Sequence, residues 1–293
     1  APRHVPRPRD VAELLKPITW FPPMWAFVCG AVSCAVPFAG RGRVVAIGLL
    51  LTGPLVMAGS QAANDWFDRD VDALNEPDRP IPSGRIPGSW GLWLALVWSA
   101  LSLVVAATLG RWGFVATLLA LACGWAYSMP PFRFKRNAWI GNLACGASYE
   151  TLAWITGAAV MLGGALPGPR ILALAALYGL GAHGMLTLND YKAIAGDQRM
   201  GIRSLPVQLG PRRAAQVASA TIVLPQCVVI ALLGVWGMPV AALLVAALVA
   251  AQLVMLAKFV AQPVERALWY SAFGVPLSVL GMMVCAVALR RAA

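Results

Sequence analysis

The sequence predicts an all-α integral membrane protein, and three observations support this prediction. Of its 293 residues, 59% are hydrophobic and only 12% are charged, whereas an average soluble domain has about 25% charged residues. The mean hydropathy is +0.71. Apolar stretches of about 20 residues, the length of a helix that crosses a bilayer, recur along the chain. This composition excludes a soluble globular domain and a disordered chain.

Nine stretches are long and apolar enough to be predicted as transmembrane helices. They are residues 20–39, 44–64, 89–109, 112–129, 138–162, 170–189, 214–234, 239–260 and 268–289. Gly, Pro and charged residues separate them, which is typical of tight turns between helices. We therefore expect residues 17–293 to form one transmembrane domain, preceded by a flexible cytoplasmic tail, residues 1–16, that is rich in Pro and Arg.

The charge distribution predicts that the functional loops lie on the cytoplasmic side. Lys and Arg outnumber Asp and Glu by 23 to 12, a net charge of +11, and short cytoplasmic loops carry such an excess. With the N-terminus inside, the basic residues on the outer side are Arg41, Arg43, Arg111, Arg170, Arg290 and Arg291. Positive charge on a membrane protein indicates contact with anionic headgroups and phosphates. Membrane lipid is thus an expected partner, and nucleic acid is excluded.

Two long inner loops resemble each other. The first begins with Asn64-Asp65-Trp66 and the second with Asn189-Asp190-Tyr191, and each continues through further Asp and Arg to a Pro-containing end. This echo predicts two repeated four-helix units plus one further helix. Many membrane folds place their site between two such halves.

The first loop carries a helical pattern of acidic residues. If the preceding span continues as a helix, Asp65, Asp68 and Asp72 lie at i, i+3 and i+7 on one face, with Asn64 beside Asp68. Carboxylates at such short distances repel one another, and a folded protein rarely keeps them without a cation. Mg²⁺ takes oxygen ligands and is usually held by one or two carboxylates plus substrate phosphates. The pattern therefore favours a Mg²⁺ site for a diphosphate substrate over a merely solvated helix end.

The second loop places Asp190 and Asp197 seven residues apart, again on one face if the loop is helical. Basic residues lie in this loop and in the loop after the fourth span: Lys192, Arg199 and Arg203, and Arg133, Lys135 and Arg136. A metal-bound anion between the two acidic loops would be held from both sides. Such an arrangement stabilises the charge that develops on a leaving diphosphate.

Three sequence strings carry a resemblance to a known family: NDWFDRDVDALNEPDRPIPSGRI, YSMPPFRFKRN and NDYKAIAGDQRMGIRSLPVQLG. They resemble the UbiA superfamily of intramembrane prenyltransferases and, within it, the branch of chlorophyll and bacteriochlorophyll synthases. The string YETLAW, from Tyr149, is more similar to the bacteriochlorophyll enzymes. The resemblance covers the chain from about Trp20 to its last residue.

This resemblance implies a fold, a reaction and a location. The fold would be nine transmembrane helices around a central cavity. The reaction would be Mg²⁺-dependent transfer from geranylgeranyl or phytyl diphosphate to the propionate of bacteriochlorophyllide a. The location would be a bacterial inner membrane, either cytoplasmic or intracytoplasmic, with the active site facing the cytoplasm.

The resemblance also assigns roles to residues. Metal ligands and catalytic residues would be Asn64, Asp68 and Asp72 in the first motif and Asp190 and Asp197 in the second. The diphosphate-facing basic pair would be Lys135 and Arg136, and Arg79 matches the family's loop arginine. The charge pattern of the second loop adds Lys192 and Arg203 as further substrate-binding candidates. One position departs from the family pattern, because Ala195 stands where members of this branch usually have Glu. The second motif therefore has one carboxylate fewer.

Two ionisable residues lie inside predicted spans. Glu150 is about 18 Å deep and His183 about 10 Å deeper than the acidic residues, by helix rise. An ionisable residue at such depth is a functional candidate, so both are predicted to meet the macrocycle, His183 as a ligand of its Mg²⁺. The alternative is that both are neutral and hydrogen-bonded within the protein.

Other functions agree less well with the sequence. A transporter would carry its ion site near the membrane midplane, whereas these acidic residues lie at one face. A quinone or haem prenyltransferase would not have the string NEPDRPIPSG, and a pigment-binding protein without activity would not need Asn64, Asp68 and Asp72. The choice between geranylgeranyl and phytyl stays open, as does that between bacteriochlorophyllide and chlorophyllide.

Overall fold

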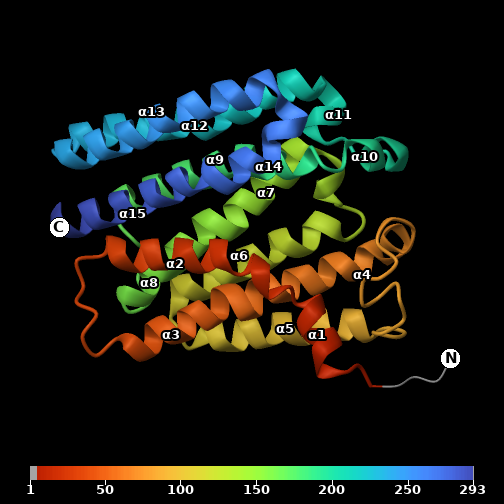
Figure 1. Ribbon diagram of the computed structural model, residues 1–293. Coiled ribbons are helices and arrows are strands. Elements are labelled where there is room, and N and C mark those ends of the chain that lie inside the picture. The colour runs from red at the N-terminus through yellow and green to blue at the C-terminus, as the bar shows by residue number, and fades with distance from the viewer. Residues whose placement is uncertain (1–4, 293) are drawn as a thin grey trace.

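The computed structural model describes residues 5–292, which form helices joined by short loops (Figure 1). Among these residues there is no strand, only one isolated parallel bridge between Asn137 and Arg203. The prediction of an all-α fold is therefore confirmed.

The helices of the first half of the chain are α1 (Pro8–Leu14), η1 (Pro17–Thr19), α2 (Phe21–Ser33), α3 (Gly42–Leu50), η2 (Leu51–Met57), α4 (Ala58–Asn75), α5 (Trp90–Ala107), α6 (Arg111–Ser128) and η3 (Phe134–Arg136). Those of the second half are α7 (Ala138–Gly146), η4 (Ala147–Thr151), α8 (Leu152–Met161), α9 (Pro169–Asp190), α10 (Ile194–Met200), α11 (Leu205–Leu209), α12 (Pro211–Val235), α13 (Pro239–Ala261), α14 (Pro263–Phe273) and α15 (Val275–Ala292). The segments η1 and η3 are 3₁₀-helical, and η2 and η4 are π-helical.

Each of the nine predicted spans overlaps one or more of these helices. In the described part of the chain, six helical runs are long and apolar enough to cross a membrane. The helix Phe21–Ser33 is apolar but shorter, and the helical runs 111–128 and 138–161 are not among the six. The protein is therefore a multi-pass membrane protein, while the count of nine spans remains a prediction.

Two long helices contain a widened turn. In the run Gly42–Asn75 the π-helical turn Leu51–Met57 contains Pro54, which lacks an N–H and crowds the preceding turn. The Nε1 of Trp98, on α5, donates a hydrogen bond to the carbonyl oxygen of Pro54 at 3.0 Å. The second widened turn, Ala147–Thr151, joins α7 to α8. Such turns often lie at functional sites because they redirect side chains.

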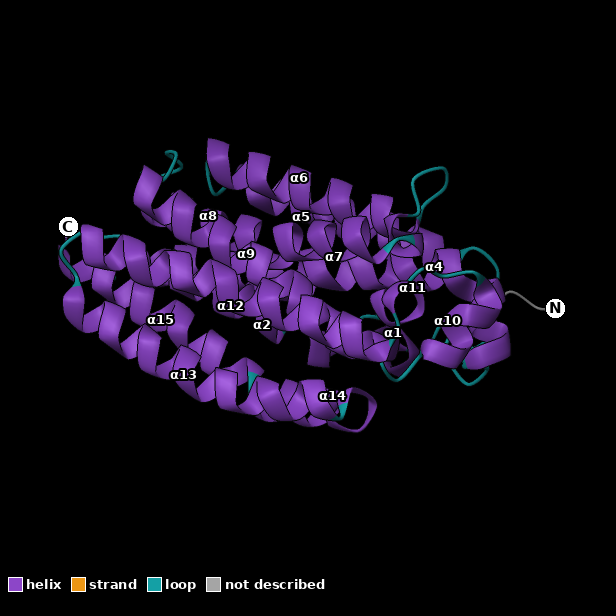
Figure 2. Ribbon diagram, turned by 90° about the horizontal axis from the view of Figure 1, so that it is seen from above, coloured by secondary structure: helices purple, strands orange, loops and turns teal. Residues whose placement is uncertain are grey.

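The helices pack closely, with the first-half helices on one side and α12, α13 and α15 on the other (Figures 1 and 2). Helix α9 packs against α12 and α7, and α2 packs against α8 and α15. Between α2 and α8 the backbones approach closely, because a Cβ at Gly30 would lie 1.9 Å from the Trp154 carbonyl oxygen and one at Gly157 would lie 2.0 Å from that of Phe27. Small residues permit such contacts between membrane helices.

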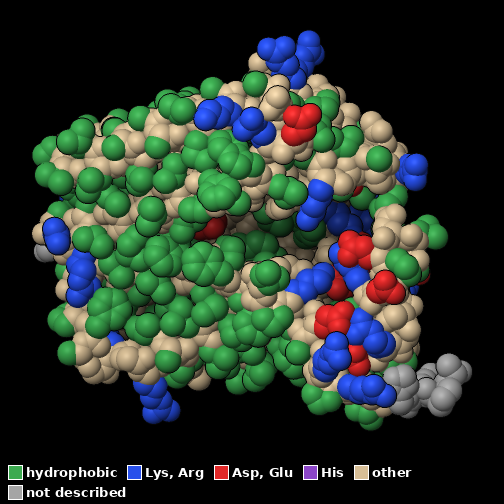
Figure 3. Space-filling view, in the orientation of Figure 1, with side chains coloured by type: hydrophobic (Ala, Val, Ile, Leu, Met, Phe, Trp, Pro, Cys, Tyr) green, Lys and Arg blue, Asp and Glu red, His purple; other side chains and the backbone are tan. Residues whose placement is uncertain are grey.

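Charged side chains gather at one end of the molecule. On the face shown in Figure 3, Asp and Glu side chains lie mainly with Lys and Arg at the end where Figure 1 has α10, α11 and the end of α4. Hydrophobic side chains cover the greater part of the remaining surface. This is the arrangement expected of a protein with one polar face outside the hydrocarbon core.

The N-terminal segment is more ordered than the sequence suggested. Helix α1 buries Leu14 fully, and its Asp10 accepts a hydrogen bond from Arg85 at 2.7 Å. Lys16 Nζ lies 2.6 Å from Asp65 Oδ1. The expectation of a flexible tail over residues 1–16 was therefore wrong for residues 8–16, because ion pairs and a buried leucine fix them; residues 1–4 lie outside the described part of the chain.

Candidate active site

A cavity of about 860 Å³ lies between the helices, in the size range of pockets that hold sizeable organic ligands. Its wall is made by residues of η1, α2, η2, α4, α6, α7, η4, α9, α14 and α15. Asn64 and Asn189, the first residues of the two acidic motifs, both line it, and so does Glu150. The cavity thus connects the apolar interior with the end of the molecule where charged side chains gather, called the polar end below.

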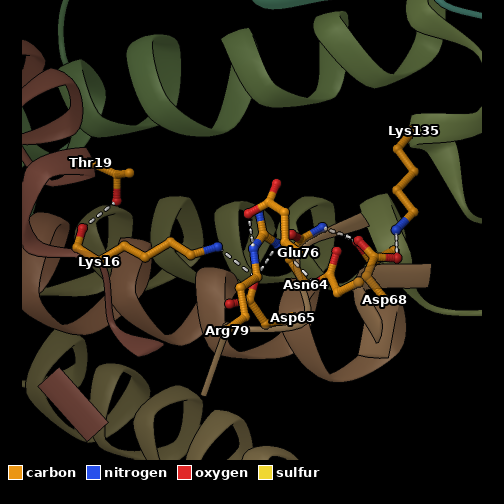
Figure 4. A network of polar contacts seen from close by, with 10 residues as sticks. Lys16, Thr19, Asn64, Asp65, Asp68, Glu76, Arg79 and Lys135 are labelled. Carbon is orange, nitrogen blue, oxygen red and sulfur yellow. Dashed lines mark hydrogen bonds and ion pairs between the residues drawn. The ribbon is translucent and has the colours of Figure 1, made fainter. Parts of the chain in front are cut away.

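The first motif lies at the C-terminal end of α4, where residues four apart share a face. Asn64 Nδ2 donates hydrogen bonds to Asp68 Oδ2 at 3.0 Å and to Ser128 Oγ at 2.7 Å. Lys135, from η3, forms an ion pair with the other oxygen of Asp68 (Figure 4). Burial lowers the pKa of Lys135 to about 8. Asp68 is therefore fixed between an amide that lines the cavity and a half-buried lysine.

The other two acidic residues of this helix face different partners. Asp65 and Asp72 are both buried. Arg79 Nη1 lies 2.8 Å from Asp72 Oδ2 and 3.5 Å from Asp65 Oδ1, and its Nε pairs with Glu76 (Figure 4). The acidic residues of this helix are therefore divided between two sets of partners. Asp68 meets Asn64 and Lys135, whereas Asp65 and Asp72 meet Lys16 and Arg79.

The second motif differs in having unpaired carboxylates. Asp190 is the last residue of α9, and its Oδ2 is buried without a hydrogen-bond partner among the described residues. Burial raises the pKa of Asp197, in the first turn of α10. No described Lys or Arg forms an ion pair with either residue. The two acidic loops touch, because Asn75 Nδ2 lies 2.9 Å from Met200 Sδ.

The predicted basic residues lie around these loops. Arg203 N donates to the Arg136 carbonyl oxygen at 3.0 Å, and Ala138 N donates to the Arg203 carbonyl oxygen at 3.1 Å. This bridge ties the loop after α6 to the second acidic loop. The side chains of Arg136, Arg203 and Lys192 are exposed, so they are available to an anion.

The side chains present fit a Mg²⁺ ion. The amide oxygen of Asn64 and the carboxylates of Asp68, Asp190 and Asp197 are hard oxygen donors, and the orphaned Asp190 Oδ2 is an acceptor that lacks a partner. Within residues 5–292, however, no three Asp, Glu, His or Cys residues form a ready cluster of ligands. Mg²⁺ commonly takes one or two carboxylates and completes its shell with water and phosphates. The donor set therefore suits a site completed by the diphosphate.

Glu150 and His183, predicted to face the same ligand, lie in different surroundings. Glu150 lines the cavity. His183 is buried, does not line the cavity, and packs against Trp139 with ring centroids 5.6 Å apart. On α9 the cavity face is formed by Ala182, Met185, Leu186 and Asn189. The expectation that His183 meets the cavity was therefore wrong, because its helical position is turned toward α7.

Several polar residues of the site were not predicted. They are Lys16, Ser60, Gln61, Tyr127, Tyr149 and Asn189. A signal for two of them was present, since Ser60, Gln61 and Asn64 recur at helical spacing within an apolar span. Asn189 could have been inferred from its correspondence with Asn64.

Comparison with known proteins identifies the family. The model of the UbiA prenyltransferase family matches residues 19–278. The chain is 52% identical over 290 residues to the bacteriochlorophyll synthase 33 kDa chain of Rhodobacter capsulatus, covering 98% of this chain and 95% of that protein. It is 38% identical to the chloroplastic chlorophyll synthase of Arabidopsis thaliana, covering 94% of this chain and 73% of that protein.

Solved structures show the same fold at low sequence identity. A digeranylgeranylglyceryl phosphate synthase superposes with a TM-score of 0.75 at 19% identity, covering 97% of this chain and 98% of that chain. A UbiA homolog from Archaeoglobus fulgidus bound to GPP and Mg²⁺ superposes with a TM-score of 0.69 at 23% identity, covering 92% and 99%. With the family match, these findings show that the chain belongs to the UbiA prenyltransferase family and is a membrane-embedded prenyltransferase.

Proposed function

We propose that this prenyltransferase transfers a geranylgeranyl or phytyl group from its diphosphate to the propionate of bacteriochlorophyllide a, with Mg²⁺ as cofactor, in the last step of bacteriochlorophyll synthesis. The observation that carries the proposal is the 52% identity, over nearly the whole chain, to a protein named bacteriochlorophyll synthase 33 kDa chain. Identity to chlorophyll synthases is lower, at 36–38%.

The polar end of the cavity would bind the diphosphate. Asn64, Asp68, Asp190 and Asp197 would hold Mg²⁺, which when bound supplies positive charge to the leaving diphosphate. The exposed side chains of Arg136, Arg203 and Lys192 would bind its oxygens directly, since guanidinium and ammonium groups form charge-assisted hydrogen bonds with phosphates. Together they would stabilise the charge that develops as the group leaves.

The transfer itself needs few groups from the protein. One oxygen of the propionate forms a bond to C1 of the prenyl group, while the C1–O bond to the diphosphate breaks and its electron pair leaves with the diphosphate. A propionate has a pKa near that of Glu, about 4.3, so it is already ionised at neutral pH. No general base is required, which agrees with the position of His183 outside the cavity wall.

The apolar part of the cavity would hold the isoprenoid and the macrocycle. Its wall includes Trp25, Met57, Val279 and Leu280. Burying apolar ligand surface there is favourable at roughly 25 cal/mol per Å². The same wall would keep water from C1 of the prenyl group as the diphosphate leaves, so the propionate would be the nucleophile within reach.

The proposed location is a bacterial inner membrane, with the polar end of the cavity on the cytoplasmic side. The support is the excess of Lys and Arg in the predicted inner loops, together with the gathering of charged side chains at one end in Figure 3.

The test is direct. Purified protein is incubated with bacteriochlorophyllide a, Mg²⁺ and either prenyl diphosphate, and the pigments are separated by chromatography. We expect a prenylated pigment that is absent when EDTA is added or the diphosphate is omitted. Chlorophyllide a and a quinone precursor serve as competing acceptors, and preferential prenylation of either would overturn the proposal.

A further inference from the structure

Among the described residues, Glu150 is the only Asp or Glu in the wall of the central cavity. It lies in the widened turn Ala147–Thr151 between α7 and α8, and its Oε2 is buried without a hydrogen-bond partner among the described residues. No Lys, Arg or His of the described chain pairs with it. A buried carboxylate without a cation is strongly disfavoured, and burial therefore favours the neutral acid, which can donate a hydrogen bond.

Of the two substrates in the proposed function, only the macrocycle offers such a donor a partner. Beyond its diphosphate, an isoprenoid consists of hydrocarbon, and packing it against Glu150 would leave the acid unsatisfied. A buried donor without a partner is destabilising. A bacteriochlorophyllide, in contrast, carries carbonyl groups on its periphery.

Depth along the helix indicates which carbonyl is met. Ala138 is held at the polar end by its backbone hydrogen bond to Arg203, and Glu150 follows twelve residues later, about 18 Å further along the helical run. A macrocycle whose propionate reaches Asp68 and Lys135 must extend inward to approach Glu150. The ring ketone lies beside the propionate and stays near the polar end. The C3 acetyl group lies on the opposite side of the macrocycle from the ring ketone.

We propose that Glu150 donates a hydrogen bond to the C3 acetyl carbonyl of the tetrapyrrole and thereby selects acetyl-bearing over vinyl-bearing acceptors. This inference rests on the proposed function and names the acceptor chemistry that the same site prefers. Glu150 is a specificity-determining residue in this account, because it touches the acceptor far from the reacting atoms.

The test compares two acceptors that share one macrocycle, chlorophyllide a with its C3 vinyl group and its 3-acetyl analogue. The wild-type protein should prefer the acetyl compound about tenfold in kcat/KM, the effect of one hydrogen bond. Glu150→Met should reduce this ratio to about one, whereas Glu150→Gln, which keeps a donor, should retain most of it. Glu265→Met, the same replacement at an exposed position on α14, should behave as wild type.

Two further readouts separate selection from a structural role. The KM for the prenyl diphosphate should be unchanged in both Glu150 variants, and resonance Raman spectra should show a lowered acetyl C=O frequency for pigment bound to wild type but not to Glu150→Met. The inference is wrong if the acetyl C=O frequency of pigment bound to wild type equals that of free pigment. It is also wrong if Glu150→Met leaves the acetyl-to-vinyl ratio of kcat/KM unchanged. Neither result affects the proposed function. If the protein forms no ester with any tetrapyrrole, the proposed function itself is overturned.

Discussion

The two acidic regions at the polar end of the cavity differ in how their charge is balanced. At the end of α4 each carboxylate that faces the protein has a basic partner: Lys16 for Asp65, Lys135 for Asp68 and Arg79 for Asp72. At the end of α9 and in α10, Asp190 and Asp197 have no such partner among the described residues. The first region is thus neutralised by the chain itself, and the second depends on positive charge brought from outside.

This difference has an energetic meaning. A carboxylate removed from water is stabilised only by a cation or by several hydrogen bonds. The first region gains rigidity from its ion pairs, whereas the second gains most when a divalent cation arrives. We therefore expect metal affinity to depend more on the second region, and the stability of the fold more on the first.

The largest effect is expected at Asp68, which accepts a hydrogen bond from the cavity-lining amide of Asn64. Asp68→Ala should reduce the transfer rate by about a hundredfold or more, since it removes a ligand and releases Lys135. Single-turnover rates with pigment analysis measure this. Asp70→Ala, which removes a carboxylate with 86% side-chain exposure two residues away, serves as control and should change the rate less than twofold.

The next effect tests the second region. Asp190→Asn should raise the Mg²⁺ concentration for half-maximal rate about tenfold, because it removes the charge of an unpaired carboxylate while keeping its shape. A Mg²⁺ titration of the transfer reaction measures it, with Asp78→Asn in an exposed stretch as the matched control. An unchanged titration would mean that Asp190 does not contact the metal.

Asp72 distinguishes a metal ligand from a partner of Arg79. Asp72→Asn should lower the free energy of unfolding by about 1–3 kcal/mol, since a buried hydrogen bond to a charged group is weakened. The effect is limited because Arg79 keeps Asp65 and Glu76. Thermal melting in detergent measures it. Unchanged melting together with a raised Mg²⁺ requirement would instead support the ligand role that the sequence predicted.

The smallest effect is expected at Ala195, an exposed residue of α10. Ala195→Glu adds a carboxylate beside the unpaired pair and should lower the Mg²⁺ concentration for half-maximal rate about threefold. Ala195→Gln, which adds the same volume without charge, should leave the titration unchanged. Equal titrations for wild type and Ala195→Glu would show that Asp190 and Asp197 suffice.

Much of this arrangement could be predicted from local sequence patterns. Helical spacing placed Asn64 and Asp68 on one face, and the match of the two motifs led to Asp190 and Asp197 as their counterparts. Apolar runs of about 20 residues located the long helices because lipid leaves the backbone few alternatives to a helix. The structure bears out the shared face of Asn64 and Asp68 and the positions of the long helices. Asp190 and Asp197 lie on two successive helices, α9 and α10, and their role as ligands stays a prediction.

Contacts between distant segments could not be predicted in this way. Lys16 belongs to a Pro- and Arg-rich segment, and its pairing with Asp65 arises only because α1 packs beside α4. The depth of His183 was estimated from helix rise, but rise does not specify the face of α9 on which it lies. The division of the acidic face likewise depends on Arg79, which a loop returns to the helix.

In the proposed reaction the propionate of the pigment attacks C1 of a prenyl group as the diphosphate leaves. The most direct test uses bacteriochlorophyllide a labelled with ¹⁸O in both propionate oxygens, followed by mass spectrometry of the ester. Attack by the carboxylate predicts that both labelled oxygens remain in the product and that the released phosphates are unlabelled. Loss of one labelled oxygen from the ester would show that the acyl group is activated instead, and would contradict this account.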